Sequence, residues 1–443
     1  MIWPSVPLEK VARVSGGSTP KRNNDAYWNG HVPWVTPSDL PGPGASIVDV
    51  EDTKDHITQE GLNSCSAPLL PLDTVLFSSR ATIGKIGIAK VPLATNQGFA
   101  NFTPNPGIDP RYLAYALRHF TPQITALAGS TTFKEVSRGA IRKFQIPLPP
   151  PSEQRRIVEI LDQADALQRR RAEADEKAQR ILPALFMKMF GNDLQEGISN
   201  LLGDAAIDFR YGTSTRSADH GYPALRIPNV VSGRVDLSEI KFVPVSKKEF
   251  ARLRLSTGDM LVVRTNGNPD YVGRSVVFEE QSVEGTGLNA DQFIYASYLI
   301  RIRLDPDILE PWFVQTFLSL PKGRRALRER CRTSAGQYNI NIDALSSIPL
   351  PEIPIERQRE LVEHVQSIRM MNSRRVELSK HLNCASSSLL YRAFSGDLTA
   401  RWRDAHADAL SQEAEEQAAA LATACVRTSN GPRRGRPRRA ASC

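Results

Sequence analysis

The sequence predicts an α+β chain in which two β-rich domains of mixed α/β structure are each followed by a long helix of coiled-coil type. Three observations predict this arrangement: an internal repeat at a fixed shift, a seven-residue apolar period after each copy, and short apolar runs separated by Gly and Pro elsewhere. A chain of 443 residues is long enough for two or three domains. The expected boundaries are domains over 1–150 and 195–352, helices over 151–194 and 353–398, and a basic tail over 399–443. The tail is expected to be disordered in part, or to form a short helix followed by a loose basic arm.

The repeat is the strongest of these signals. Ile146-Pro147-Leu148-Pro149 recurs as Ile348-Pro349-Leu350-Pro351, and a charged segment with helical periodicity follows each copy. A shift of 204 positions then aligns identical residues over the two segments, ending on Asp193-Leu194 and Asp397-Leu398. The aligned pairs include Gln154 with Gln358, Arg155 with Arg359, Val158 with Val362, Glu159 with Glu363, Leu185 with Leu389 and Phe190 with Phe394.

The two charged segments are predicted to be long helices with a coiled-coil seam, because apolar residues recur at heptad spacing. In the first copy the seam reads Ile157, Ile160, Ala164, Leu167, Arg171, Ala174, Ala178, Ile181, Leu185. In the second it reads Leu361, His364, Ile368, Met371, Arg375, Leu378, Leu382, Ala385, Leu389. Both copies carry arginine at the same seam position, which favours a fixed register between the helices. Pro183 is expected to kink or end the first helix, and the second copy has no proline there.

Each domain contains an Asp-led apolar run that is followed by a polar, Arg-bearing loop and an apolar-Gly pair. The runs are 73–77 and 259–263, the loops continue over 78–85 and 264–274, and we interpret the apolar-Gly pairs as turns. Later, Asp109-Pro110 and Glu310-Pro311 each open a predicted short helix with proline at its first position. Two domains with one plan and different loops suggest two readers of different targets.

Loops rich in Arg, Lys, Asn, Gln and Thr have the chemistry of base-edge and phosphate contacts. The DNA-binding candidates in the first domain are Thr19, Lys21, Arg22, Arg80, Lys85, Asn96, Gln97 and Lys134. Those in the second domain are Thr215, Arg216, Arg226, Arg264, Asn266, Arg274, Gln337 and Tyr338. For each of them, an exposed structural or solubilising role is the alternative. In the tail, Arg434-Gly435-Arg436-Pro437-Arg438 resembles the core of an AT-hook, with non-specific electrostatic attraction as the alternative.

Composition narrows the class of protein. We expect a cytoplasmic chain, because no run approaches the ~18 apolar residues of a membrane span, no signal-peptide pattern opens the sequence, and the five scattered cysteines form no C-x-x-C pair. The net charge of +8 is compatible with a nucleic-acid partner, but six of the arginines lie in the last 17 residues. Charge alone therefore does not establish DNA binding.

With these motifs, the sequence resembles the specificity (S) subunits of type I restriction–modification systems over nearly the whole chain to about residue 398. The repeated Ile-Pro-Leu-Pro elements and the Gln-Arg helix starts carry most of the resemblance, supported by Gly17–Pro20, Tyr27–Gly30, Asn96–Gly98 and Arg264–Gly267. The family implies two target-recognition domains that each read half of a bipartite, asymmetric site in double-stranded DNA. It also implies that the helices pair antiparallel as a pseudo-twofold repeat, set the gap and dock two methyltransferase subunits, which restriction/translocase subunits join.

The resemblance assigns roles to residues of the helices and no cofactor to this chain. The residues expected at the helix pairing or at partner surfaces are Gln154, Arg155, Ile157, Leu161, Arg171, Gln358, Arg359, Leu361 and Arg375. S-adenosylmethionine, Mg and ATP are expected only on partner subunits. The segment beyond residue 400 is not part of the family pattern.

The sequence predicts no catalytic residues and no metal site. It contains no N-P-P-[YF] loop of an amino-methyltransferase, no Pro-Asp followed by Glu-x-Lys of a nuclease, and no Walker-type glycine loop. Its seven histidines do not cluster at metal-ligand spacing. A specificity domain of another DNA modification complex and a non-catalytic coiled-coil adaptor remain as alternatives, although an adaptor does not explain two matched, loop-rich domains.

Overall fold

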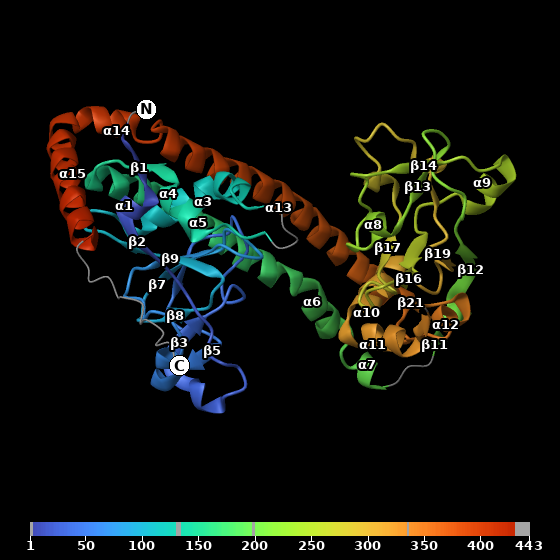
Figure 1. The fold of residues 1–443 in the computed structure, drawn as a ribbon. Coiled ribbons are helices and arrows are strands. Elements are labelled where there is room, and N and C mark those ends of the chain that lie inside the picture. Colours follow the sequence, from blue (N-terminus) through green and yellow to red (C-terminus); the bar gives the residue numbers. More distant parts are fainter. Residues whose placement is uncertain (1–2, 130–133, 197–199, 335, 430–443) are drawn as a thin grey trace. The chain divides into compact units, whose positions relative to one another are not determined.

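The computed structural model describes residues 3–129, 134–196, 200–334 and 336–429 (Figure 1). The chain divides into two compact units. Unit 1 comprises residues 1–173 and 378–443, and unit 2 comprises residues 174–377. Each unit thus contains one β-rich domain, the beginning of one long helix and the end of the other. Helices and sheets are mixed in both units, which confirms the α+β fold class.

Unit 1 is built around a five-stranded sheet with strand order β2-β9-β6-β7-β4, in which only the β4–β7 pair is parallel. A three-stranded sheet, β5-β3-β8, lies beside it in the same unit. The strands are β2 (Ala12–Gly16), β3 (Trp28–Val35), β4 (Val48–Val50), β5 (Asp55–Ile57), β6 (Val75–Ser78), β7 (Ile86–Ala89), β8 (Ala94–Thr95) and β9 (Phe99–Pro104). Helix α3 (Pro110–Ala126) packs on β6 and β7, and its Tyr112 and Tyr115 are fully buried in the core.

Unit 2 repeats this plan with different details. Its four-stranded antiparallel sheet has the order β12-β19-β15-β17, and its three-stranded sheet has the order β14-β13-β18. The strands are β12 (Ala206–Tyr211), β13 (Tyr222–Leu225), β14 (Lys241–Val243), β15 (Met260–Val263), β17 (Ser275–Val277), β18 (Ile294–Tyr295) and β19 (Leu299–Leu304). Helices α10 (Pro311–Ser319) and α11 (Pro321–Arg330) complete the core, and a small sheet, β16-β21-β20, is added.

The strand pairings show that the internal repeat is structural. In both units the middle strand of the three-stranded sheet has one antiparallel and one parallel neighbour. The two Ile-Pro-Leu-Pro elements form equivalent strands, since β10 (Gln145–Pro147) pairs with β1 (Ser5–Pro7) and β22 (Pro349–Leu350) pairs with β11 (Asn200–Leu201). Pro110 and Pro311 each begin a helix, as predicted.

The apolar-Gly pairs are turns, as the sequence predicts. Gly84 and Gly273 follow Ile83 and Val272 with φ values of 95° and 77°, in the left-handed region that favours glycine. A Cβ atom on Gly84 would lie 2.4 Å from Thr121, and one on Gly273 would lie 2.7 Å from Leu327. In each unit, the loop after the buried central strand therefore turns tightly against a helix.

The first spacer helix is interrupted and the second is continuous. Helix α5 (Pro151–Gln179) is followed by α6 (Ile181–Phe190) and α7 (Asp193–Glu196), whereas α13 runs unbroken over Ile355–Ser395. The break lies four residues before Pro183, whose missing N–H cannot bond the carbonyl of Gln179 and whose ring would clash with it. Ser387 stands at the matching position of the second copy, so that helix continues.

The helices pair antiparallel, but the predicted seam is only half right. Gln168 Nε2 donates to Asn383 Oδ1 (3.4 Å), and Arg375 Nε donates to Asp175 Oδ1 (2.9 Å), so later residues of α5 meet earlier residues of α13. One predicted row is buried or half-buried in each helix: Ile157, Ala164, Arg171, Ala178, Leu185 and Leu361, Ile368, Arg375, Leu382, Leu389. The other predicted row is largely exposed, including Leu167 (53%), Met371 (53%) and Leu378 (57%).

The prediction fails for one row because the second row of each helix that faces the other helix is mostly polar. It contains Gln168 and Asp175 on α5 and Asn372, Ser379 and Ser386 on α13, all half-buried or buried. A search for an apolar period passes over such a row and selects the apolar row on the other side of the helix. Both arginines predicted in the seam, Arg171 and Arg375, do lie in its inward row and are half-buried.

Of the two expectations for the tail, disorder is wrong for residues 400–429, which are helical. They form α14 (Ala400–Ala405) and α15 (Ala407–Ser429), helices that pack on unit 1 with Leu410 and Gln417 buried. Thr399 Oγ1 and Arg403 Nε donate to Glu153 Oε1 (2.7 and 2.8 Å), and Gln417 Nε2 donates to the carbonyl of Gly107 (3.1 Å). The arginine-rich segment 430–443, with its AT-hook-like residues, lies outside the described residues.

Candidate nucleic-acid interface

In unit 1, the loop before β3 and the turn after β8 bring several predicted residues together. Thr19 donates a hydrogen bond to Gln97, which is exposed. The Arg22 guanidinium lies over the rings of Trp28 (4.2 Å) and Trp34 (4.9 Å), and it pairs with Asp55 at 3.2 Å. Because the Arg22 side chain is still 60% exposed, this stack presents a positioned cation at the surface.

The remaining candidates of unit 1 separate into surface and interior residues. Arg80 pairs with Glu135 at 3.4 Å and is exposed, as are Lys21 and Lys134. Lys85 donates to the carbonyls of Pro37 and Leu40 (2.5 and 2.9 Å), and Asn96 Oδ1 accepts from the amide of Gly98 (2.9 Å). Lys85 and Asn96 therefore hold loops in place, and their side chains are poorly placed to contact DNA.

In unit 2, the predicted residues gather on the small sheet formed by β16 (Thr265–Asn266), β21 (Gln337–Asn339) and β20 (Arg332–Ser334). Thr265 Oγ1 donates to Gln337 Oε1 at 3.0 Å, and Tyr338 is half-buried beside them. The Arg264 guanidinium lies over the Tyr211 ring at 4.7 Å. Strand pairing thus joins two of the predicted segments, 264–266 and 337–338, which are far apart in sequence.

The other candidates of unit 2 differ in accessibility. Thr215 and Arg216 are exposed on the loop after β12. Arg226 donates to the carbonyl and carboxylate of Glu239 (3.2 and 3.3 Å), and Asn266 Oδ1 accepts from the amide of Asn268 (2.8 Å), so both stabilise local structure. Arg274 is exposed and lies over the Tyr271 ring at 4.7 Å.

Sequence reasoning missed the basic residues of α11. Arg324 and Arg328 approach Arg274 around the loop that contains Asp270, although some fifty positions separate them in the chain. The density of basic residues in Pro321–Arg330 was a signal that could have selected them.

The Gln-Arg motif at each helix start is a structural clamp. Gln154 Oε1 accepts from the amide of Asp109 (2.8 Å), and its Nε2 donates to the carbonyls of Gly107 (3.2 Å) and Pro149 (2.9 Å). Gln358 makes the equivalent three bonds, with the amide of Glu310 (3.0 Å) and the carbonyls of Ile308 (3.1 Å) and Ile353 (2.7 Å). Both glutamines are buried, so this repeated motif joins each helix to its own domain.

The other helix residues that the resemblance singled out have two different environments. Ile157, Leu161 and Leu361 are fully buried in the domain cores, which excludes them as partner contacts in this fold. Arg155 and Arg359 are exposed, and Arg359 pairs with Glu310 at 3.2 Å.

Residues 2–176 match a family model described as the type I restriction modification DNA specificity domain. The EcoKI specificity subunit of Escherichia coli (strain K12) is 25% identical over 457 residues, which cover 95% of this chain and 94% of that protein. The MjaIX specificity subunit of Methanocaldococcus jannaschii is 34% identical over 190 residues, 42% of this chain and 44% of that protein. The chain is thus similar over nearly its whole length to a type I restriction specificity subunit, and its residues 2–176 match the specificity-domain model.

Solved structures show the same fold. The crystal structure of a type I restriction–modification S subunit from M. genitalium aligns over 89% of this chain and 96% of its own length, with 13% identity and a TM-score of 0.52. A chain from a structural study of complex assembly and conformational transition of the type I R-M system aligns over 89% of this chain and 98% of its own, with 18% identity and a TM-score of 0.54. The α+β fold of this chain therefore matches that of solved type I S subunit structures.

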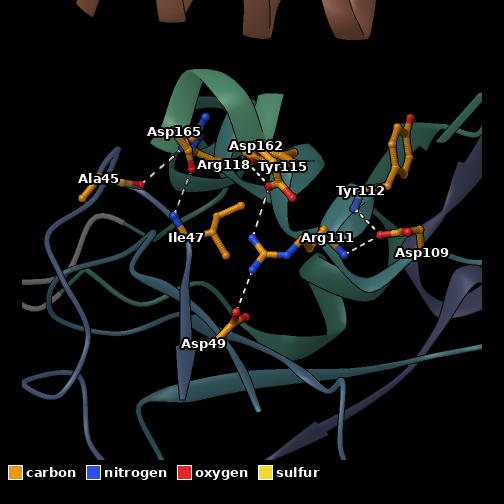
Figure 2. Close-up of polar contacts among 10 residues, drawn as sticks. All are labelled: Ala45, Ile47, Asp49, Asp109, Arg111, Tyr112, Tyr115, Arg118, Asp162 and Asp165. Carbon is orange, nitrogen blue, oxygen red and sulfur yellow. Dashed lines mark hydrogen bonds and ion pairs between the residues drawn. The ribbon is translucent and has the colours of Figure 1, made fainter. Parts of the chain in front are cut away.

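A buried polar network fixes α5 to the domain of unit 1 (Figure 2). Arg118 Nη1 contacts both carboxylate oxygens of Asp165 (2.9 and 3.0 Å), and these side chains are 7% and 1% exposed. Asp165 also accepts from the amide of Ile47 at 3.3 Å. Arg111 bridges Asp49 (2.7 Å) and Asp162 (3.2 Å). Burial lowers the pKa of Arg111, but the two carboxylates outweigh burial, so the pKa is raised.

The corresponding contact in unit 2 has the opposite charge polarity. Position 165 corresponds to Arg369 by the shift of 204, and Arg369 Nη1 pairs with Glu279 of the domain at 2.7 Å. The Arg369 guanidinium also lies over the Trp312 ring at 3.8 Å, and Trp312 Nε1 donates to Glu279 (2.9 Å). The helix thus supplies the acid in unit 1 and the base in unit 2.

Two further findings concern metal sites and membrane-spanning helices. Among the residues that the structure describes, no group of three His, Cys, Asp or Glu side chains could hold a metal ion. Over the same part of the chain, no helix combines the length and the apolar character that a membrane crossing requires.

Proposed function

We propose that this chain is the DNA-recognition subunit of a type I restriction–modification complex and reads a bipartite, asymmetric site in double-stranded DNA. The observation that carries the proposal is that one scaffold occurs twice with different polar surfaces. Four strands of the main sheet and the three strands of the smaller sheet correspond between the two units, whereas the polar surfaces differ: Arg22 lies on a tryptophan pair in unit 1, and Arg264 lies beside Thr265 and Gln337 in unit 2. Two different surfaces on one framework suit two different half-sites.

The exposed apolar rows of the spacer helices support docking of two methyltransferase subunits, which restriction/translocase subunits then join. Leu167 and Ile181 in the first spacer segment, and Met370, Met371 and Leu378 on α13, are 42–61% exposed. Apolar side chains repeated along a helix surface are typical of a protein interface. On this proposal methyl transfer and cleavage belong to the partner subunits, together with S-adenosylmethionine, Mg and ATP.

The decisive experiment exchanges one domain at a time. Replacing residues 1–150 by the equivalent domain of a relative with a known target should change one half of the methylated sequence, and replacing residues 195–352 should change the other half. Methylated bases would be mapped across the genome in cells that carry the partner subunits and each chimaera. If either exchange altered both half-sites together, the two units would not be independent readers. Methyl transfer by the purified chain alone would contradict its role as a non-catalytic subunit.

A further inference from the structure

Three arginines of unit 2 surround one short loop. Arg274 Nε donates to the carbonyl of Asp270 (3.0 Å), and Arg324 Nη2 donates to the carbonyls of Asp270 (3.1 Å) and Val272 (3.0 Å). Arg328 pairs with the Asp270 carboxylate. Together they line a cavity of about 410 Å³, whose wall also includes Ser275 and Ser319. Three guanidinium groups and one carboxylate leave this cavity with an excess of positive charge.

The charges in this cavity act on one another. Burial lowers the pKa of Arg324, and repulsion from Arg274 and Arg328 lowers it further. The hydrogen bond and charge of Arg328 lower the pKa of Asp270, so this carboxylate is ionised at neutral pH. A single internal acid cannot neutralise three arginines, and an anion that enters the cavity would relieve their repulsion.

The position of the cavity indicates which anion it takes. Asp270 and Arg274 lie on the segment that follows β16, and Thr265 of β16 bonds Gln337 in the hairpin formed by β20 and β21, where predicted DNA-binding residues gather. Arginine binds phosphate oxygens through forked hydrogen bonds, and backbone phosphate contacts of this kind orient a protein so that neighbouring residues reach the base edges. An open site one loop away from the hairpin fits that task.

We propose that Arg274, Arg324 and Arg328 form a clamp for a backbone phosphate of the DNA that unit 2 reads, with Asp270 moderating its charge. This inference rests on the proposed function and adds to it a specific binding site. The clamp contributes to affinity at every sequence and carries no base preference of its own.

The clamp can be weakened and strengthened by single substitutions. Arg274→Gln removes one charge, so we expect affinity of the full chain for a labelled DNA duplex to fall about three- to tenfold, and the slope of log K against log salt to become shallower by about 0.9. Asp270→Asn removes the opposing acid while the bonds from Arg274 and Arg324 to the main-chain carbonyls remain. It should tighten binding and steepen the slope.

Changes in DNA affinity of opposite sign in these two variants would distinguish a charge effect from damage to the fold, because damage to the fold would weaken binding in both. Arg254→Gln and Asp291→Asn serve as matched controls, because they change another partly exposed arginine–acid pair of unit 2, 3.7 Å apart. Fluorescence anisotropy between 50 and 200 mM salt would measure each variant, and far-UV circular dichroism would verify folding.

Five outcomes overturn the clamp. Weaker binding by Asp270→Asn, an unchanged slope in Arg274→Gln, or equal effects in the control pair would each contradict it while leaving DNA recognition intact. Saturable binding of inorganic phosphate that Arg274→Gln abolishes without changing DNA affinity would assign the cavity to a free phosphate. If the unaltered chain did not bind duplex DNA at 50 mM salt, the proposed function would fail together with the clamp.

Discussion

Replacing Arg403 by methionine tests whether the C-terminal helices are an integral part of unit 1. The Glu153 side chain at the start of α5 is fully buried, and it accepts hydrogen bonds from Trp3 Nε1 (2.8 Å), Thr399 Oγ1 (2.7 Å) and Arg403 Nε (2.8 Å). Arg403 supplies the positive charge among these donors. Without it, a buried carboxylate retains only neutral donors while the helices still shield it from water.

The magnitude follows from the burial of the two partners. Removing one member of a buried ion pair costs about 3–5 kcal/mol, and the 19% exposure of Arg403 reduces this to about 2–3 kcal/mol. Glu153→Gln should cost less, about 1–2 kcal/mol, because water can reach the remaining arginine. In the double variant both charges are gone, so its loss of unfolding free energy should be about 2 kcal/mol smaller than the sum of the two single losses.

Tryptophan fluorescence during urea unfolding is a suitable assay, because four of the five tryptophans, Trp3, Trp28, Trp34 and Trp402, lie in unit 1. With a slope of about 2–3 kcal/mol per M urea, Arg403→Met should lower the midpoint by about 1 M. Arg401→Met is the matched control, since Arg401 is exposed on the same helix, α14. Additive losses, or an Arg403→Met midpoint equal to that of the control, would refute the reasoning.

Three further predictions concern the tail, pH and the spacer helices. Ending the chain after residue 429 should leave the unfolding midpoint of unit 1 unchanged and weaken DNA binding only in a salt-dependent way. Ending it after residue 398 should instead destabilise unit 1. Equal unfolding midpoints for the two truncations would contradict this prediction. Burial lowers the pKa of His119, whose ring stacks on Phe394 with the ring centroids 4.9 Å apart. The contribution of this histidine to the stability of unit 1 should therefore be complete above the unfolded pKa of about 6.5, and it should decline as the pH falls toward the lower folded pKa. His119→Phe should abolish this component of the pH profile. Inserting four residues after Ala174 and four after Arg374 adds about one turn, ~6 Å, to both helices, and it should lengthen the gap of the methylated site by one or two base pairs. Insertion into α5 alone should break the Asp175–Arg375 pair and reduce methylation activity.

The sequence was sufficient to predict the repeat where the geometry requires the same residue in both copies. Gln154 and Gln358 bond three backbone groups each, because the side-chain amide of glutamine carries an acceptor for the backbone amide and donors for the carbonyls. The repeat is therefore visible without a structure, and so is the break at Pro183. The second row of the helix pairing was not visible, because Gln168, Asp175 and Asn372 carry no apolar signal.

Binding candidates were harder to predict, because residue type does not show whether a polar side chain is already satisfied inside the fold. Lys85 and Arg226 have the chemistry of DNA contacts, yet each bonds carbonyls of its own domain. Arg324 and Arg328 were missed because the loop that joins them to Arg274 is distant in the sequence. In the tail, composition left disorder and a short helix open, and it could not show that Arg403 of α14 bonds the buried Glu153 of α5.

The two junctions between helix and domain show how a duplicated framework became asymmetric. Glu153 and Arg357 occupy equivalent positions by the shift of 204, and each has a partner of opposite charge, Arg403 in unit 1 and Asp193 (2.9 Å) in unit 2. The same reversal separates Asp165 with Arg118 from Arg369 with Glu279. Reversing both members of a pair preserves the attraction within each unit, but a helix start transferred to the other unit would meet its own sign of charge. Such a like-charge contact is unfavourable, above all in unit 1, where the acids Glu153 and Asp165 are buried. The apolar positions and the glutamine clamps therefore retain the repeat, while the ion pairs make its two copies distinct and tie each helix start to one domain.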